Sequence, residues 1–264
     1  MKRSNVRMNP TLNGNIHLGH VYVALVNWEE AQKSGGRFIL RYDDSQEIWD
    51  LRMTPDEQTT IGRQVLKDLR MFGIEPDEVF SQRAREADVE RIIQELNSGE
   101  ITESKLVWSD NSPECTWSNT LYCAYNFPMT AEKVAFDFMS EITCLIRGED
   151  LISEAGLYSY ICERWRLPQP RQVYLPRMLD CNGQEISKTK GFPTVQQLSK
   201  TMSVPEMIDL LERACLKDVD GGWGFENIKR EPMLPYDLSM AIQAGKETKS
   251  DLIAGVKQLN DGYK

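Results

Sequence analysis

Long apolar runs and a surplus of positive charge are both missing from this 264-residue chain. No stretch approaches the ~18 apolar residues of a membrane-spanning helix, and the N-terminal residues lead into a folded motif instead of an apolar signal region. Forty acidic residues against 31 basic ones give a net charge of -9, unlike a basic nucleic-acid-binding domain. We therefore expect a cytoplasmic protein without membrane contact, in which any contact with nucleic acid is local.

Paired cysteines and histidines are also scarce. The six cysteines include no C-x-x-C pair and the chain has two histidines, which excludes the common zinc-ligand sets. We expect reduced, mostly buried thiols and no metal site in the protein itself. Hydrophobic residues make up 41% of the chain and charged residues 27%, which is typical of a globular protein with one substantial core.

The first 45 residues follow the order strand, loop, helix, strand. Residues 4–8 suit a short strand and lead into a loop rich in Pro, Asn and Gly. From about residue 19, apolar residues recur at three- and four-residue spacing up to Gly35-Gly36, a pair typical of a helix end. Residues 37–42 predict a second strand. Such units build parallel sheets, so we expect an α/β fold.

The middle of the chain alternates regular and irregular segments. Thr54-Pro55-Asp56-Glu57 is a capping box that predicts the start of a helix. A second helix carries apolar residues between 89 and 96 and ends near Gly99. Residues 101–122 show no clear period, so we predict an irregular insertion there.

Regular patterns return in the second half. Residues 142–147 predict a buried strand, and a helix with Leu157, Ile161 and Trp165 on one face follows. Residues 173–187 predict a hairpin, because Asn-Gly at 182 and 183 favours a tight turn. Residues 203–206 are typical of a helix start.

Both histidines belong to His17-Leu18-Gly19-His20, where the first loop enters the first helix. Free backbone N–H groups and the helix dipole favour a phosphate at such a position. Two imidazoles can donate to phosphate oxygens, and glycine permits a close approach. The alternative is a pair of surface histidines without a ligand.

A longer segment around the histidines carries a family resemblance. Residues 7–20, RMNPTLNGNIHLGH, resemble without a gap the N-terminal signature of class I glutamyl- and glutaminyl-tRNA synthetases. Four further segments resemble that family in order, and all five matches lie within about the first 195 residues. The four segments are residues 24–45, 125–127, 146–152 and 175–191. The resemblance implies a doubly wound, Rossmann-like parallel sheet. It also implies that ATP and Mg²⁺ are used to activate glutamate, which is then transferred to the acceptor end of a tRNA.

The resemblance assigns roles to individual residues. It implies that ATP is bound by Thr11, His17, Gly19, His20, Ser187 and Lys188. It also implies that His17, His20 and Lys188 are catalytic. For glutamate it implies Arg7, Tyr125 and Arg147 around the side chain and Asp43 at the amino group. Buried charges need partners, so a cation facing a carboxylate and an anion facing an ammonium agree with these roles. Ion pairs at strand ends are the alternative for Arg7, Asp43 and Arg147.

Several positions depart from the family pattern. The loop around Lys188 has Glu185 in place of the first lysine and Thr189 after Lys188, so it carries less positive charge than usual. We expect a catalytic domain at residues 1–190, with the acceptor-arm insertion reduced to residues 81–124. Residues 191–264 would form a small helical region, which leaves no room for an anticodon-binding domain.

This layout is nearest to the truncated glutamyl-queuosine tRNA(Asp) synthetases, and we expect a monomer. Glutamate and glutamine enzymes share several of these features, so the choice of glutamate depends on the two arginines. Two alternatives stay open. The first is adenylation with transfer to a small molecule or carrier protein, which the acidic charge and short insertion favour. The second is an inactive nucleotide-binding paralogue.

Overall fold

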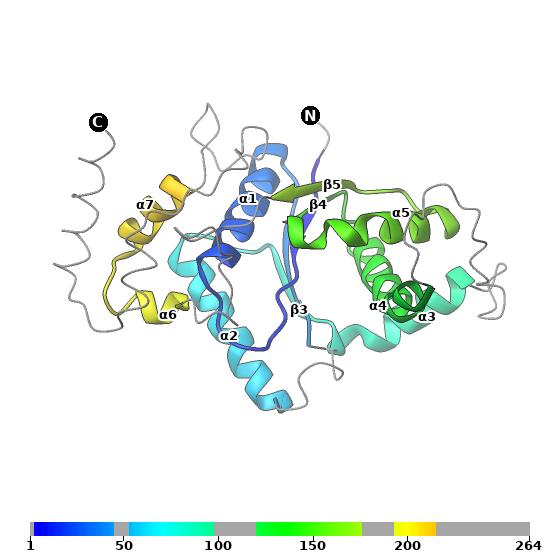
Figure 1. Cartoon of the computed structure of the whole chain (residues 1–264), viewed down its shortest axis with the longest axis horizontal. Coiled ribbons are helices and arrows are strands. Elements are labelled where there is room, and N and C mark those ends of the chain that lie inside the picture. Colours follow the sequence, from blue (N-terminus) through cyan, green and yellow to red (C-terminus); the bar gives the residue numbers. More distant parts are fainter. Residues whose placement is uncertain (1–2, 45–52, 98–119, 176–192, 215–264) are drawn as a thin grey trace.

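The computed structural model describes residues 3–44, 53–97, 120–175 and 193–214 (Figure 1). Three parallel strands form one sheet, with β2 (Phe38–Tyr42) paired on one side to β1 (Val6–Met8) and on the other to β3 (Glu78–Ser81). Two more strands, β4 (Cys144–Gly148) and β5 (Arg171–Leu175), pair in parallel. The predicted α/β class with parallel strands is confirmed.

The two groups of strands meet between β1 and β4. The backbone N–H groups of Thr143 and Cys144 donate to the carbonyl of Asn5, at 3.0 and 3.2 Å. The strand order is therefore β3-β2-β1-β4-β5, in which the chain starts at the centre and extends first to one edge and then to the other. This is the order of a doubly wound nucleotide-binding sheet, whose ligands bind beyond the carboxyl ends of the strands where the direction of winding changes.

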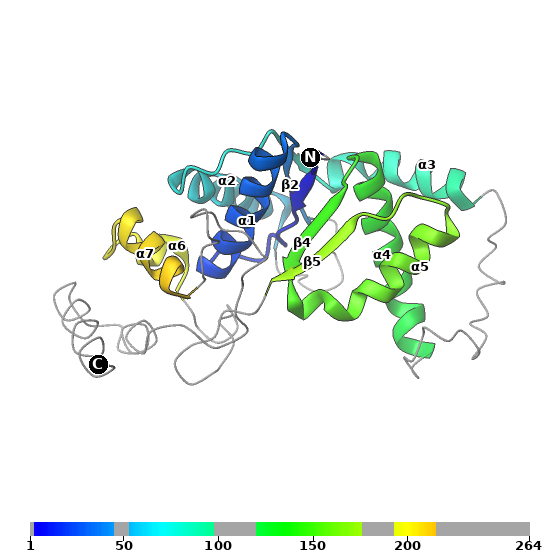
Figure 2. The same ribbon diagram turned by 90° about the horizontal axis from the view of Figure 1, so that it is seen from above.

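Helices cover both faces of these strands. On one face lie α1 (Leu18–Ser34) and α2 (Pro55–Met71), and on the other lie α3 (Glu86–Asn97), α4 (Thr120–Met139) and α5 (Ala155–Arg164) (Figure 2). Side chains alternate along a strand, so Phe38 and Leu40 enter one core and Ile39 enters the other. Burial on both faces explains the nearly continuous apolar sequence of β2 and β4.

Local sequence signals account for most helix ends. Helix α1 ends at Gly35, whose left-handed backbone (φ 67°) suits glycine, and α2 begins with the capping box of Thr54 and Glu57. A short 3-10 turn (Arg83–Arg85) leads into α3, and another (Glu149–Glu154) joins β4 to α5. Helices α1, α2, α3 and α5 agree with helices that the sequence predicts, whereas the two 3-10 turns were not predicted.

Helix α4 is the main element that sequence periodicity missed. It contains Pro128, a residue that usually breaks a helix, and the polar segment before it favours a loop. The irregular insertion predicted for residues 101–122 is wrong at its end, because residues 120–122 already belong to α4. The rest of that insertion lies outside the described residues. The same is true of most of the hairpin predicted at 173–187, although its first strand overlaps β5.

Two helices from the last described segment return to the first half of the sheet. The Val195 N–H of helix α6 (Val195–Leu198) donates to the carbonyl of Ile16, in the segment between β1 and α1, at 2.9 Å. Helix α7 (Val204–Ala214) starts at the predicted cap and buries Met207 and Leu211 in the core beside α1. Among the described helices, none combines the length and hydropathy needed to cross a membrane.

Candidate active site

The predicted site residues that the structure describes gather where the central strands end. Asp43 directly follows β2, and its backbone N–H donates to the carbonyl of Pro10 at 3.1 Å in the loop after β1. The carbonyl of Asp43 accepts from the N–H of Leu12 at 3.2 Å, so the two chains stay paired beyond their strands. This pairing holds Thr11 and Asp43 next to each other at the edge where doubly wound folds bind ligands.

Both histidines lie at the start of α1, as the sequence predicts. His17 is the N-cap, and its Nδ1 accepts a hydrogen bond from the N–H of Gly19 at 3.1 Å. The Nδ1 of His20 accepts from the His17 N–H at 3.4 Å, and the ring centroids are 4.0 Å apart. The histidines thus form the capping box of this 17-residue helix, so its positive end meets two imidazoles.

Asp43 is a buried carboxylate with one oxygen available. Its Oδ2 accepts from the hydroxyl of Thr11 at 3.4 Å, whereas its Oδ1 is buried and has no hydrogen-bond partner among the described residues. Burial raises the pKa of Asp43, and the positive charges of Lys133 and Arg41 oppose that rise. A buried acceptor without a partner is costly, so a ligand that brings a cationic donor would stabilise this oxygen.

Arg7, on β1, is held by an acid that sequence reasoning missed. Its Nε and Nη2 donate to the two oxygens of Asp137 on α4, at 2.9 and 3.0 Å. Arg41 donates to the same carboxylate at 2.8 Å, and the hydroxyl of Tyr158 donates at 3.0 Å. Burial alone would raise the pKa of Asp137, but the charges of Arg7 and Arg41 hold it at about 2. Two cations therefore share one buried carboxylate.

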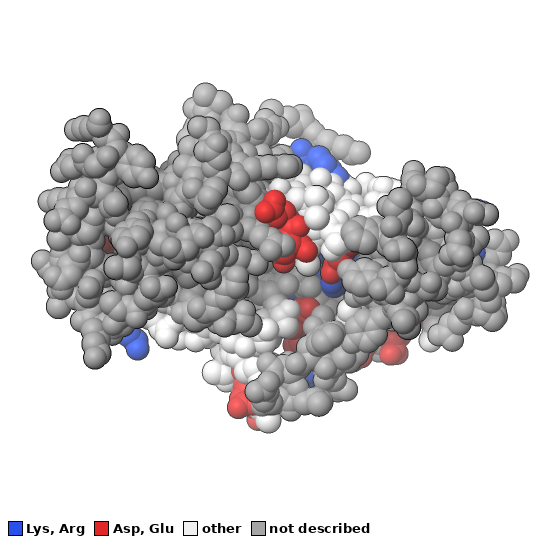
Figure 3. Space-filling model, viewed as in Figure 1, with Lys and Arg blue, Asp and Glu red and all other residues white. Residues whose placement is uncertain are grey.

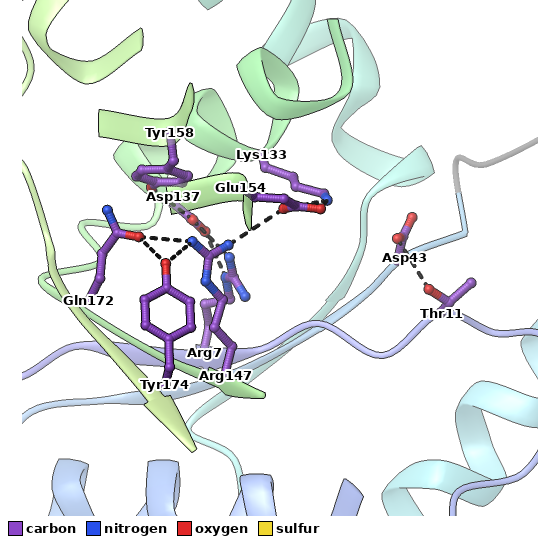
Figure 4. A network of polar contacts seen from close by, with 10 residues as sticks. All are labelled: Arg7, Thr11, Asp43, Lys133, Asp137, Arg147, Glu154, Tyr158, Gln172 and Tyr174. Carbon is purple, nitrogen blue, oxygen red and sulfur yellow. Dashed lines mark hydrogen bonds and ion pairs between the residues drawn. The ribbon is translucent and has the colours of Figure 1, made fainter. Parts of the chain in front are cut away.

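Arg147, at the end of β4, lies in a second polar cluster (Figure 4). Its Nη2 donates to Gln172 Oε1 and to the Tyr174 hydroxyl, both at 2.9 Å, and its Nη1 is 3.6 Å from a carboxylate oxygen of Glu154. Glu154 also binds Lys133, at 3.2 Å. Acidic and basic side chains lie next to each other in the middle of the face shown in Figure 3. Lys133 and Glu154 were missed, because a lone lysine and a glutamate 21 residues apart form no motif.

The remaining predicted residues are placed in part or not at all. Gly19 lies in the first turn of α1, and Tyr125 belongs to α4, where its side chain is not among those described. Ser187 and Lys188 lie outside the described residues. The structure therefore pairs His17 with His20 and Thr11 with Asp43. It places Arg7 beside Arg147, as Figure 4 shows. Of the described residues, no group of three His, Cys, Asp or Glu side chains is arranged to hold a metal ion.

Comparison with known proteins agrees with this geometry. Residues 4–102 match the family model described as tRNA synthetases class I (E and Q), catalytic domain. This part of the chain is thus similar to the catalytic domain of class I tRNA synthetases. The matched residues include β1, α1, β2 and Asp43, so the match covers the histidine and carboxylate positions described above.

Several curated proteins that are similar to this chain are glutamate–tRNA ligases. Glutamate–tRNA ligase 2 of Bartonella bacilliformis is 36% identical over 91 residues, which cover 34% of this chain and 18% of the relative. The glutamate–tRNA ligase of Prochlorococcus marinus is 25% identical over 304 aligned residues, which cover 85% of this chain and 63% of the relative. The chain thus spans less than two thirds of the length of the relatives it matches.

Solved synthetase structures share the fold. A glutamate tRNA ligase from Elizabethkingia meningosepticum superimposes with a TM-score of 0.66 at 14% identity, over 90% of this chain and 68% of that structure. A tyrosyl-tRNA synthetase from Archaeoglobus fulgidus gives 0.58 at 14% identity, over 98% and 87%. At such identities the likeness concerns the fold alone, and it confirms the predicted Rossmann-like fold.

Proposed function

We propose that this chain uses ATP to activate glutamate as glutamyl-adenylate and transfers the glutamyl group to the acceptor end of a tRNA. One observation carries the proposal: a buried, partly unpartnered carboxylate, a histidine-capped helix start and clusters with excess cations lie at one edge of the sheet. The glutamate–tRNA ligase relatives support the choice of reaction.

The histidine-capped start of α1 is the proposed site of the ATP phosphates. Adenylation displaces pyrophosphate at the α-phosphate, so the site must stabilise negative charge that develops on phosphate oxygens. In this proposal Thr11, Gly19, His17 and His20 bind ATP, and Ser187 and Lys188 approach the leaving pyrophosphate. Mg²⁺ would enter with the nucleotide, since it is commonly held by substrate phosphates with few protein ligands.

The amino acid would bind beside the nucleotide with its ammonium at Asp43. The available Oδ1 of that carboxylate supports this placement, because an ammonium supplies both charge and a donor. Arg147 and Arg7, with Tyr125 from α4, would surround the side-chain end. The reacting carboxylate then lies between Asp43 and the phosphates of ATP, as in-line attack requires.

The proposed organisation is a catalytic domain at residues 1–190 with a short insertion at 81–124, followed by a helical region at 191–264. Packing of α7 against the core beside α1 supports a close association of that last region with the nucleotide half of the fold. Arg83 and Arg85, at the start of the insertion, bind internal partners: Arg83 donates to Gln58 and Arg85 to Glu78. We therefore propose that binding of tRNA is weak and depends on salt.

Amino-acid-dependent exchange of pyrophosphate into ATP tests adenylation directly. We expect exchange with glutamate, with or without total tRNA, and a loss of about 100-fold in rate for Lys188→Ala if that cation acts in the transition state. No exchange with any of the twenty amino acids, with tRNA present, would refute the enzyme. Exchange without formation of labelled glutamyl-RNA at low salt would instead assign the acceptor to a small molecule or carrier protein.

A further inference from the structure

Lys133 and Glu154 form an ion pair that no sequence motif predicts. The Nζ of Lys133, on α4, lies 3.3 and 3.2 Å from the two carboxylate oxygens of Glu154. The same carboxylate is 3.6 Å from Arg147 Nη1. The other partners of Arg147, Gln172 and Tyr174, are neutral. Two cations thus share one carboxylate, and the three side chains together carry a charge of +1.

This excess charge is shielded from water but can be reached. The side chains of Lys133 and Glu154 are 19% and 20% exposed, whereas that of Arg147 is 5% exposed. A partly desolvated excess cation favours an anionic ligand, because water compensates the charge poorly. The Arg7–Asp137–Arg41 cluster also has one cation in excess, but its side chains are at most 7% exposed. Of the two clusters, the one with Lys133 is therefore the better placed to meet a ligand.

Lys133 places this excess charge near Asp43, the residue proposed to bind the ammonium group. In the view of Figure 4, the charged ends of Lys133 and Glu154 lie between Arg147 and Asp43. Thr11 lies beside Asp43. Among the charges that oppose the burial-raised pKa of Asp43, that of Lys133 has the largest effect, which agrees with a lysine close to that carboxylate. The acid proposed for the ammonium therefore lies near the excess cation proposed for a second anion, as a dicarboxylic amino acid requires.

We propose that Lys133, together with Arg147, binds the side-chain carboxylate of the amino acid, and that Glu154 is an internal anion with which this carboxylate competes. The inference rests on the proposed function for its choice of an amino acid as ligand. Lys133 is thus a specificity residue for glutamate. Glutamine fits the same shape but brings no charge, so it leaves the excess cation uncompensated.

The competition gives the two variants opposite effects. Lys133→Met removes the excess cation and should weaken glutamate binding about 10- to 100-fold, the usual effect of losing a charged hydrogen bond. Glu154→Gln removes the competing anion and should tighten glutamate binding. Glutamine binding should change less than about twofold in either variant, because it depends on neither charge. A purely structural ion pair would respond with the same sign to loss of either partner.

Titration calorimetry of the full chain with glutamate and with glutamine measures these affinities without requiring catalysis. Lys67→Met, on the exposed side of α2, is the matched lysine control and should leave both affinities unchanged. Lys133→Arg should keep most of the glutamate affinity, since it keeps the charge. If Lys133→Met does not fold, the sign of the Glu154→Gln effect decides alone.

Weaker glutamate binding in both variants, or no change in either, would overturn the inference, and so would a wild-type chain that does not bind glutamate. The expected opposite shifts support it even where pyrophosphate exchange is absent. In that case the adenylation proposal fails and the binding inference stands. Normal pyrophosphate exchange, together with equal effects of both variants on glutamate affinity, would support the adenylation proposal and overturn the binding inference.

Discussion

Replacing Asp137 with asparagine tests how much one buried carboxylate stabilises the fold around the site. Asp137→Asn keeps the size of the side chain and removes its charge. The carboxylate accepts from Arg7 Nε and Nη2, from Arg41 Nη1 and from the Tyr158 hydroxyl, at 2.8 to 3.0 Å. An asparagine can accept through its oxygen alone, and its NH₂ group would face donors. The variant therefore leaves two buried guanidinium groups without an anion.

The size of the loss follows from burial. Side chains of Arg41, Asp137 and Arg7 are 1%, 2% and 7% exposed, so water cannot replace the missing charge. Arginine stays protonated even here, although burial and repulsion from Arg7 lower the pKa of Arg41 despite the charge of Asp137. Removing one partner from such a buried group costs about 3 to 5 kcal/mol. We expect a decrease of that size in the free energy of unfolding.

Urea unfolding of Asp137→Asn and of a matched exposed variant measures the loss. Glu75 binds Arg70 with equally short contacts, 2.5 to 3.0 Å, but these side chains are 60% and 54% exposed. Glu75→Gln should therefore change the free energy of unfolding by less than about 1 kcal/mol. Equal losses in the two variants, or a loss below about 1 kcal/mol for Asp137→Asn, would refute the argument from burial.

The same comparison has a defined pH dependence. The pKa of Asp137 is about 2 in the folded chain, below its ordinary value of 3.8, so folding favours its ionised form. The corresponding stabilisation, about 2 to 3 kcal/mol, is present above about pH 4 and is lost as the pH falls through about 2. The difference between wild type and Asp137→Asn should shrink over that range. A difference that stayed constant from pH 6 to about 2 would show that charge does not contribute.

Three further predictions concern local geometry, and urea unfolding checks each of them. Gly36→Ala should lower the free energy of unfolding by about 3 kcal/mol or more, because the new Cβ would overlap the backbone carbonyl of Ser4. Gly156→Ala, in open space on α5, should raise it by about 0.5 to 1 kcal/mol. Similar effects of the two variants would contradict this prediction. Thr54→Ala should lose about 1 kcal/mol with the capping box of α2, and a neutral result would rule out capping as a stabilising factor there. His17→Ala should lose about 0.5 to 2 kcal/mol, while His17→Asn retains a capping acceptor and should lose less. Both His17 variants should nevertheless raise the KM for ATP in pyrophosphate exchange, and a normal KM in His17→Asn would limit His17 to capping.

Local signals in the sequence were enough to predict most of the fold. Gly35 at the end of α1 and the capping residues around Thr54 act within one turn, so they can be recognised without tertiary information. Buried strands are apolar on both faces, which predicts a parallel sheet. Helix α4 was missed because Pro128 opposes a helix locally, and packing of Val134 and Phe136 in the core outweighs that preference.

The sequence predicted where His17 and Asp43 lie, but it did not predict which acids the arginines contact. His17 and Asp43 follow strand or loop ends that the sequence marks clearly, and they lie where expected. Asp137 reaches Arg7 across 130 residues and Arg41 across 96, distances over which no periodicity operates. A single acid in the otherwise apolar run around Phe136 was the one available signal, since a buried acid requires a partner.

The partners change the interpretation of the two arginines that resemblance assigns to one pocket. Arg7 uses two of its nitrogens on Asp137, whereas Arg147 shares Glu154 with Lys133. Each cluster carries one positive charge in excess, and Asp43 supplies one negative charge, so these groups together remain at +1. If glutamate is the ligand, as we propose, its net charge of -1 neutralises them, whereas a zwitterion with a neutral side chain does not. Selectivity for glutamate would then depend on the excess of cations over internal acids, and a variant that adds or removes one acid should alter it more than a variant that only changes shape.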